Sequence, residues 1–190
     1  YAELVRWHTT LELSPEEVHA AGLARMTDIQ AQMRSLLDGV SFAGTAREYL
    51  EQIKADPRWC ASGAEAIAAV FQRYIDRIAP HIEASFNFKP RAAHSVAPLP
   101  EALEGSMTFG YYSPPTATEP RGLFNFNAVN LSQGPLHNLG ALTYHELVPG
   151  HHFHIASQFE SETLHPLRRR AMMINAFNEA WAEYSATLAG

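Results

Sequence analysis

The chain has 190 residues, of which 46% are hydrophobic and 18% charged, and its formal net charge at pH 7 is −6. Such a chain can bury a core as one domain, and its negative charge without a basic surface argues against nucleic-acid binding. No apolar stretch reaches the roughly 20 residues of a membrane span, and the single Cys60 excludes an internal disulfide.

Residues 1–88 have helical patterns, and three helix starts are predicted within them. Residues 14–17, Ser-Pro-Glu-Glu, combine an N-cap serine, a first-turn proline and acids at the positive end of the helix dipole. Residues 45–48 and 62–65 each fit a capping box. We expect Pro80 to kink or end the helix that starts at the second box.

The pattern changes over residues 89–134, where loops and short strands are expected because Pro and Gly are frequent. The runs 107–112 and 123–129 have strand composition, and we expect them to pair as antiparallel strands. The second run could bind an extended peptide by adding it to a sheet edge. Tyr111 and Tyr112 lie in the first run and resemble core aromatics, but one phenol could donate to a developing oxyanion, and Tyr112 is our candidate.

Helical patterns return over residues 135–190, from about 136 to 159 and from 164 to the end. The order of helices, a small sheet and a final helix pair predicts a mainly α fold with a small antiparallel β element. Six of the ten histidines fall between residues 137 and 165, which favours a metal site in this helix pair.

The most informative stretch is residues 143–154, which read Thr-Tyr-His-Glu-Leu-Val-Pro-Gly-His-His-Phe-His. It begins like the H-E-x-x-H helix of zinc proteases, with His145 as a ligand and Glu146 beside it as a base. In that motif the second histidine comes four residues after the first, on the same helix face. Here Pro149 occupies the position, so the pattern departs from the motif.

A distortion of the helix would repair this departure. A π-bulge or kink that absorbs Pro149 and Gly150 would bring His151 onto the face of His145. Without the bulge, His152 lies about 20° from that face at roughly 100° per residue. A plain helix break would instead give a site built from a loop with similar ligands. The residues themselves leave both histidines open as the second ligand.

A third ligand is expected from a second helix around residues 175–184. Glu179 and Glu183 are four apart on one face of this largely apolar segment. Two buried acids need a partner, and a zinc ion or a zinc-bound histidine is one. Glu179 would then ligate, and Glu183 would accept a hydrogen bond from a ligand histidine. Taken alone, the pair would more often be a solvated helix face.

The two motifs together resemble the bacterial family called domain of unknown function 885, which resembles the gluzincin metallopeptidases. The resemblance covers nearly the whole chain and implies the C-terminal portion, residues 1–190, of a single zincin-like domain in a longer protein. Carried over by position, it implies His145, His151 and Glu179 as zinc ligands and Glu146 as the base. Two His and one Glu leave a fourth zinc position open for water.

The sequence therefore predicts a zinc-dependent hydrolase, a peptidase or amidase that acts on a peptide or small amide. Glu146 would take a proton from a zinc-bound water and give it to the leaving amine. The alternatives are a non-catalytic binding module with a metallopeptidase-like fold and a hydrolase of non-peptide amides or esters. Because Tyr1 is not Met and Gly190 follows a helical pattern, we expect both ends to be cut, and we expect a soluble protein that is either secreted or cytoplasmic.

Overall fold

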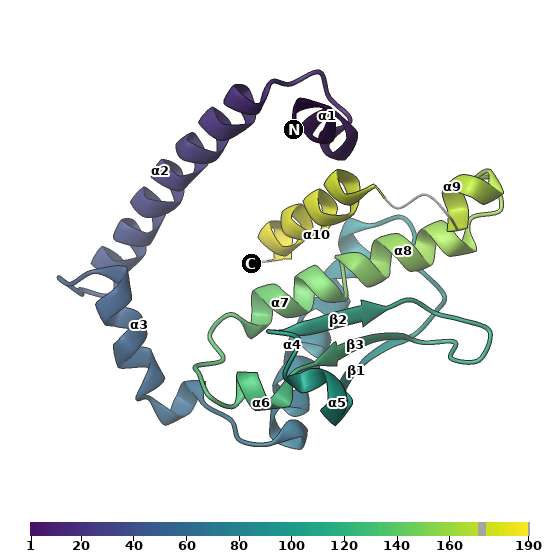
Figure 1. Cartoon of the computed structure of the whole chain (residues 1–190). Coiled ribbons are helices and arrows are strands. Elements are labelled where there is room, and N and C mark those ends of the chain that lie inside the picture. Colours follow the sequence, from purple (N-terminus) through teal and green to yellow (C-terminus); the bar gives the residue numbers. More distant parts are fainter. Residues whose placement is uncertain (171–173, 190) are drawn as a thin grey trace. The chain divides into compact units, whose positions relative to one another are not determined.

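The computed structural model describes residues 1–170 and 174–189 (Figure 1). The helix predicted from residue 164 onward therefore includes residues that lie outside the described ones. The chain divides into two compact units, Tyr1–Trp59 and Cys60–Gly190. None of the described helices is both long and apolar enough to cross a membrane.

The first unit consists of helices joined by short turns, as expected. It contains α1 (Ala2–Thr9), α2 (Pro15–Gly39), α3 (Ala46–Lys54) and the short 3-10 helix η1 (Pro57–Trp59). Two predicted helix starts are confirmed. The Ser14 hydroxyl accepts a hydrogen bond from the Glu17 N–H at 3.2 Å, and the Glu17 carboxylate accepts one from the Ser14 N–H at 2.8 Å. Thr45 and Glu48 make the same reciprocal pair at the start of α3.

The second unit begins with α4 (Ala64–Ser85), whose predicted start is wrong. Gly63 is the N-cap with φ +83°, and no side chain caps the helix. The helix therefore starts one residue later than the box at Ser62 requires, and the serine lies outside it. The helix also continues through Pro80, so the expected helix end at that residue is not found.

A three-stranded sheet follows, built from β1 (His94–Pro98), β2 (Gly110–Ser113) and β3 (Gly122–Phe126) in the order β1-β3-β2. The predicted antiparallel pairing of β2 with β3 is confirmed. The sheet is nevertheless mixed, because β1 pairs with β3 in parallel. Sequence patterns missed β1, whose residues His-Ser-Val-Ala-Pro have little strand composition.

The position of β3 in the sheet contradicts the expectation that its run adds a peptide. Both edges of β3 are already paired, so its backbone groups are used within the sheet. The predicted strand 123–129 also ends early, because Asn127 becomes the buried N-cap of α6 (Ala128–Leu131). Within the sheet, β2 has one partner strand and therefore a second edge without one.

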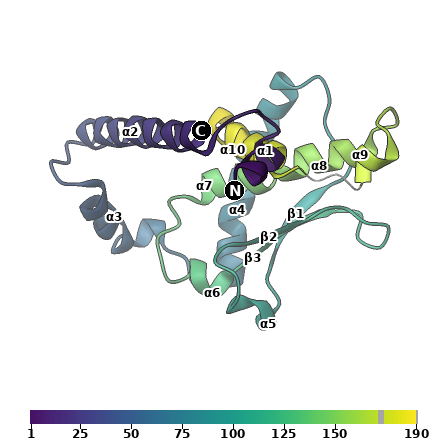
Figure 2. The same ribbon diagram turned by 45° about the horizontal axis from the view of Figure 1, so that its top comes forward.

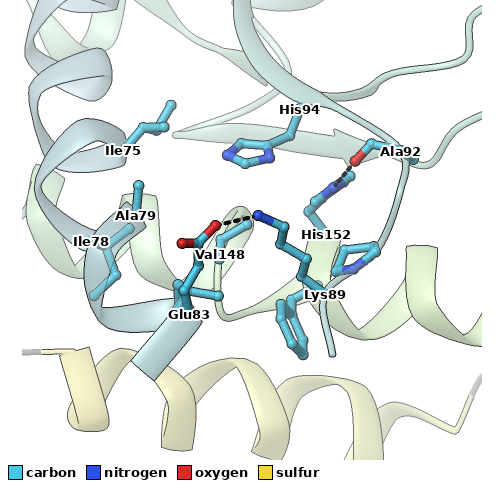
Figure 3. Close-up of a pocket in the computed structure, with 12 residues that line it drawn as sticks. Ile75, Ile78, Ala79, Glu83, Lys89, Ala92, His94, Val148 and His152 are labelled. Atoms are coloured by element: carbon cyan, nitrogen blue, oxygen red, sulfur yellow. Dashed lines mark hydrogen bonds and ion pairs between the residues drawn. The ribbon is translucent and has the colours of Figure 1, made fainter. Parts of the chain in front are cut away.

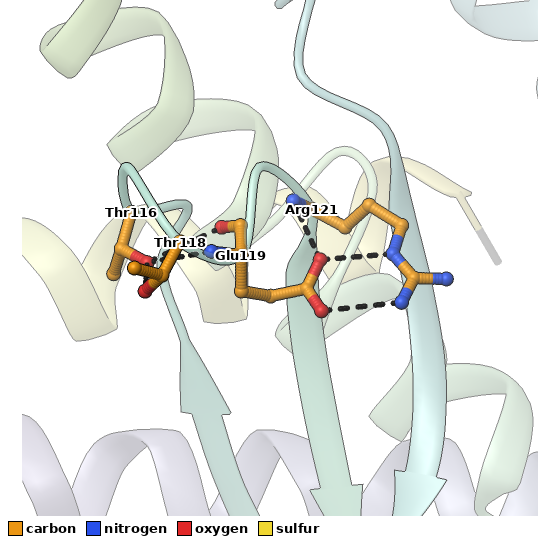
Figure 4. A network of polar contacts seen from close by, with 4 residues as sticks. All are labelled: Thr116, Thr118, Glu119 and Arg121. Atoms are coloured by element: carbon orange, nitrogen blue, oxygen red, sulfur yellow. Dashed lines mark hydrogen bonds and ion pairs between the residues drawn. The ribbon is translucent and has the colours of Figure 1, made fainter.

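Residues 114–121 connect β2 to β3 through a loop with its own polar contacts (Figure 4). The Thr116 N–H donates to the Glu119 carbonyl at 2.7 Å, and the Glu119 N–H donates to the Thr116 hydroxyl at 3.0 Å. The Arg121 guanidinium lies 2.9 Å from the Glu119 carboxylate. These exposed contacts shape the loop but contribute little to stability.

The remaining helices of the second unit are α5 (Glu101–Glu104), α7 (Leu139–Glu146), α8 (His151–Glu160), α9 (Pro166–Arg170) and α10 (Asn175–Ala189). In both views, α7 and α8 lie between the sheet and α10 (Figures 1 and 2). One core cluster joins α4 to the sheet, with the Phe71 ring 5.6 Å from that of Phe124. A second joins α4 to α7 and α8 through Ile78, Tyr144 and Phe153. Buried packing thus fixes the end of α7 and the start of α8.

Candidate metal centre

The motif forms two helices, so the predicted single bulged helix is wrong. α7 ends at Glu146 and α8 begins at His151, and the Val148–Pro149 peptide between them is cis. Proline has no N–H to continue the helical bonds, and the chain leaves the helix before it. The Phe153 N–H donates to the Leu147 carbonyl at 3.2 Å across the break. This is the plain break that the sequence left open as an alternative.

Gly150 lets the second helix start against the end of the first. A Cβ atom at this position would lie 1.8 Å from the carbonyl oxygen of His145, which no side chain can tolerate. The break is held from the other side by Trp181, whose indole N–H donates to the Pro149 carbonyl at 2.8 Å. This close approach places His151 beside His145, with ring centroids 4.8 Å apart.

The three predicted zinc ligands converge. One donor atom from each of His145, His151 and Glu179 lies within 4.8 Å of the other two, and this is the cluster of metal-ligand type found among the described residues. The Glu179 Oε2 atom is 3.5 Å from His145 Nε2 and 3.6 Å from His151 Nε2. Donor atoms bound to a tetrahedral zinc at about 2.0 to 2.1 Å are about 3.3 to 3.4 Å apart. The two separations from Glu179 are close to this value, and two histidines with one glutamate are donor groups that zinc binds.

Glu183 occupies the position expected of a residue that orients a ligand. Its Oε1 atom lies 3.2 Å from His145 Nδ1, which leaves the Nε2 atom of that histidine facing Glu179. The expectation that both acids are buried is wrong, because the side chains of Glu179 and Glu183 are 57% and 77% exposed. Phe177 and Tyr184 on the same helix are exposed as well. The roles assigned to Glu179 and Glu183 therefore rest on the proximity of both carboxylates to His145 and not on burial.

We expect Glu183→Gln to weaken zinc affinity by about 10- to 100-fold without unfolding the protein, because the loss of the carboxylate charge makes His145 a poorer ligand. Competition with a chromophoric chelator measures the affinity, and circular dichroism measures the fold. Glu162→Gln, which changes an exposed acid outside the site, is the matched control. An affinity equal to that of this control would make Glu183 a solvated surface residue.

The buried environment sets the protonation of the site. Burial lowers the pKa of His151 to about 4, with a further contribution from the charge of His145, so the imidazole is neutral at pH 7, as a metal ligand must be. The Nδ1 atom of His151 is buried without a hydrogen-bond partner among the described residues. Burial raises the pKa of Glu146 to about 7, and the charge of Glu179 adds to the shift.

Two hollows meet at His145 and Glu146. One, of about 530 Å³, is lined by apolar side chains including Met107, Phe109 and Leu142. The other, of about 370 Å³, is more polar and is lined by residues that include Tyr111, Tyr112, Asn175 and Asn178. Glu146 therefore borders both hollows, and a bound molecule could extend into both of them.

His152, the other candidate ligand, is engaged elsewhere. It is completely buried, with Nε2 3.0 Å from the Ala92 carbonyl and Nδ1 2.9 Å from the Tyr112 hydroxyl. A carbonyl only accepts, so Nε2 carries the hydrogen and Nδ1 accepts from the phenol. Gly122 packs against this ring, where a Cβ would lie 2.2 Å from Nδ1. With both nitrogens used, His152 joins α8 to β2 and to the segment just before β1, and it does not belong to the donor cluster.

Tyr112 lies beside the cluster, its ring stacked on that of His151 with centroids 6.4 Å apart. Its single hydroxyl hydrogen is donated to His152, and not toward the three donor atoms. Sequence reasoning missed this bond and the contribution of Ala92 to it. Neither contact has a local sequence signal. Ala92 comes just before β1, the strand that sequence patterns did not predict, and it reaches His152 only because that strand joins the sheet.

Comparison with known proteins assigns the chain to a family but gives it no activity. The model of the family described as "Bacterial protein of unknown function (DUF885)" matches residues 1–190. No curated protein matches the chain. Among solved structures, "the putative lipoprotein from Colwellia psychrerythraea" is similar over 100% of this chain, with 28% sequence identity and a TM-score of 0.90. The chain covers 33% of that protein, so it spans about a third of the length of its structural relative.

Proposed function

We propose that this chain, which belongs to the bacterial family of unknown function DUF885, forms the metal-binding part of a zinc-dependent hydrolase, a peptidase or amidase of the gluzincin type. The observation that carries the proposal is the convergence of His145, His151 and Glu179 next to Glu146. The similarity in fold to a much longer protein supports the view that further chain completes the catalytic unit.

His145, His151 and Glu179 would hold the ion, and Glu183 would accept a hydrogen bond from Nδ1 of His145, which would turn the Nε2 atom of that ring toward the ion. Zinc bound by two His and one Glu keeps an open position, polarises a carbonyl and lowers the pKa of bound water to about 7. Glu146 would take the proton of the attacking water on a carboxylate oxygen and pass it to the departing amine. Its carboxylate has no hydrogen bond or ion pair with another described residue, which leaves it free for this role.

The surroundings of Glu146 favour an extended substrate. The apolar hollow would take the group on one side of the scissile bond, and the hollow with Asn175 and Asn178 would take the group on the other. The second edge of β2, whose Tyr111 and Tyr112 line the polar hollow, offers backbone groups to an extended peptide. Tyr112 remains the candidate oxyanion donor, a role that requires its hydroxyl to leave His152.

The proposal is tested by metal analysis of protein purified without a chelator or His-tag. We expect near-stoichiometric zinc in the wild type and loss of most of it in His145→Ala and Glu179→Ala, because a three-residue site loses a donor in each. His137→Ala, which removes an exposed histidine outside the cluster, should keep the full content. Equal zinc in the wild type and in both ligand variants would refute the metal site.

A further inference from the structure

Another cavity, separate from the two hollows at the candidate metal centre, lies between α4 and the start of α8 (Figure 3). Its volume is about 170 Å³. Its walls are mainly aliphatic and aromatic, formed by Ile75, Ile78, Ala79, Ile82, Val148 and Phe153. None of the three proposed zinc ligands lines it, so its occupant would be independent of the proposed hydrolytic site.

One wall of the cavity is polar and incompletely used. His94 and His152 lie there with ring centroids 4.8 Å apart. Both nitrogens of His152 are bonded, to Tyr112 and Ala92. The imidazole of His94, in contrast, has no hydrogen-bond partner among the described residues. Burial lowers the pKa of His94, so the neutral ring presents one donor and one acceptor.

The charged groups of the cavity neutralise one another. Lys89 and Glu83 both line it, and the Lys89 ammonium donates to the Glu83 carboxylate. Figure 3 shows this pair and the His94 ring facing the same space. The two side chains are 63% and 66% exposed and already paired with each other, so a neutral ligand would leave this pair intact. The lining therefore combines apolar walls with one neutral hydrogen-bonding group.

We propose that this cavity is a binding site for a small neutral molecule that has an apolar ring or chain and one hydrogen-bonding group, such as a phenol. An apolar cavity of about 150 Å³ accommodates a benzene ring, so the volume here suits a single ring with one substituent. The apolar body would contact the isoleucines of α4 and Phe153. The hydroxyl would pair with the free imidazole of His94.

The probe is phenol, titrated into the purified protein while the methyl resonances of Ile75, Ile78 and Ile82 are followed by NMR. We expect saturable shifts of these methyls. Benzene, which lacks the hydroxyl, should bind about 3- to 10-fold more weakly because one hydrogen bond is lost. His94→Phe keeps an aromatic ring but removes the bonding group, and it should abolish the preference for phenol over benzene.

A second variant tests the location of the site by filling it. Ala79→Phe adds a ring to the wall and should weaken phenol binding by about 10-fold or more. Ala69→Phe makes the same change at an exposed position of α4 outside the cavity and should leave binding unchanged. The proposal would be overturned if phenol gave no saturable methyl shifts, or if Ala79→Phe and Ala69→Phe bound phenol equally well. If Ala79→Phe does not fold, an undiminished phenol preference in His94→Phe would overturn it as well.

Discussion

His151→Ala should remove most of the bound zinc, whereas His152→Ala should leave the zinc content largely unchanged and lower stability. The Nε2 atom of His151 lies 3.6 Å from Glu179, and its Nδ1 atom has no hydrogen-bond partner among the described residues. His152 is fully buried and bonded at both nitrogens. Its removal leaves a void and unpaired groups on Tyr112 and Ala92, which we expect to cost about 2 to 5 kcal/mol in the free energy of unfolding.

Metal analysis and denaturant unfolding of the two variants separate these effects, and His137→Ala serves as the control for removing a histidine from the surface. The two neighbouring substitutions should therefore give opposite results, one in zinc content and the other in stability. Loss of zinc from a stably folded His152→Ala, together with full retention in His151→Ala, would contradict the assignment. It would mean that α8 is rotated in solution so that the other histidine faces His145.

Glu146→Gln should retain zinc and fold while losing about 10²-fold or more of any hydrolytic turnover. The substitution keeps the size of the side chain and removes the basic carboxylate that would accept the proton of water. Because no described residue makes a hydrogen bond or ion pair with this carboxylate, the neutral amide should leave the surrounding structure unchanged. The measurement is kcat on a substrate found by screening peptides and small amides against the full-length protein.

Glu162→Gln, which changes an exposed acid outside the site, is the control for this substitution and should keep full turnover. Full turnover of the zinc-bound Glu146→Gln protein would show that another group takes the proton. If the wild type binds zinc and cleaves neither peptides nor amides nor esters in a broad screen, a non-catalytic binding role becomes the better account. Cleavage of esters or non-peptide amides alone would instead change the substrate class.

The sequence by itself determined the features that depend on neighbours within one or two helical turns. The helix starts at Ser14 and Thr45 could be predicted because the capping contacts join residues three apart. The spacing of Glu179 and Glu183 placed both acids on one face of α10, and both lie near His145. The predicted ligand set stays a prediction until metal is measured, but its members are brought together.

The tertiary structure decided what local patterns left open or got wrong. His151 and not His152 lies beside His145, because Gly150 packs on the His145 carbonyl and other contacts occupy both nitrogens of His152. These contacts come from β2 and from the segment just before β1, tens of residues away in the chain. Such long-range pairing leaves no periodic signal in the sequence.

The sheet shows the same division. Strand composition predicted the pairing of β2 with β3, but the weakly patterned β1 becomes a strand only because β3 offers it a parallel edge. That strand and the segment just before it bring His94 and Ala92 to His152, where both residues line the cavity beside α4. Local chemistry thus specified which residues could act, and packing between distant segments decided which of them meet.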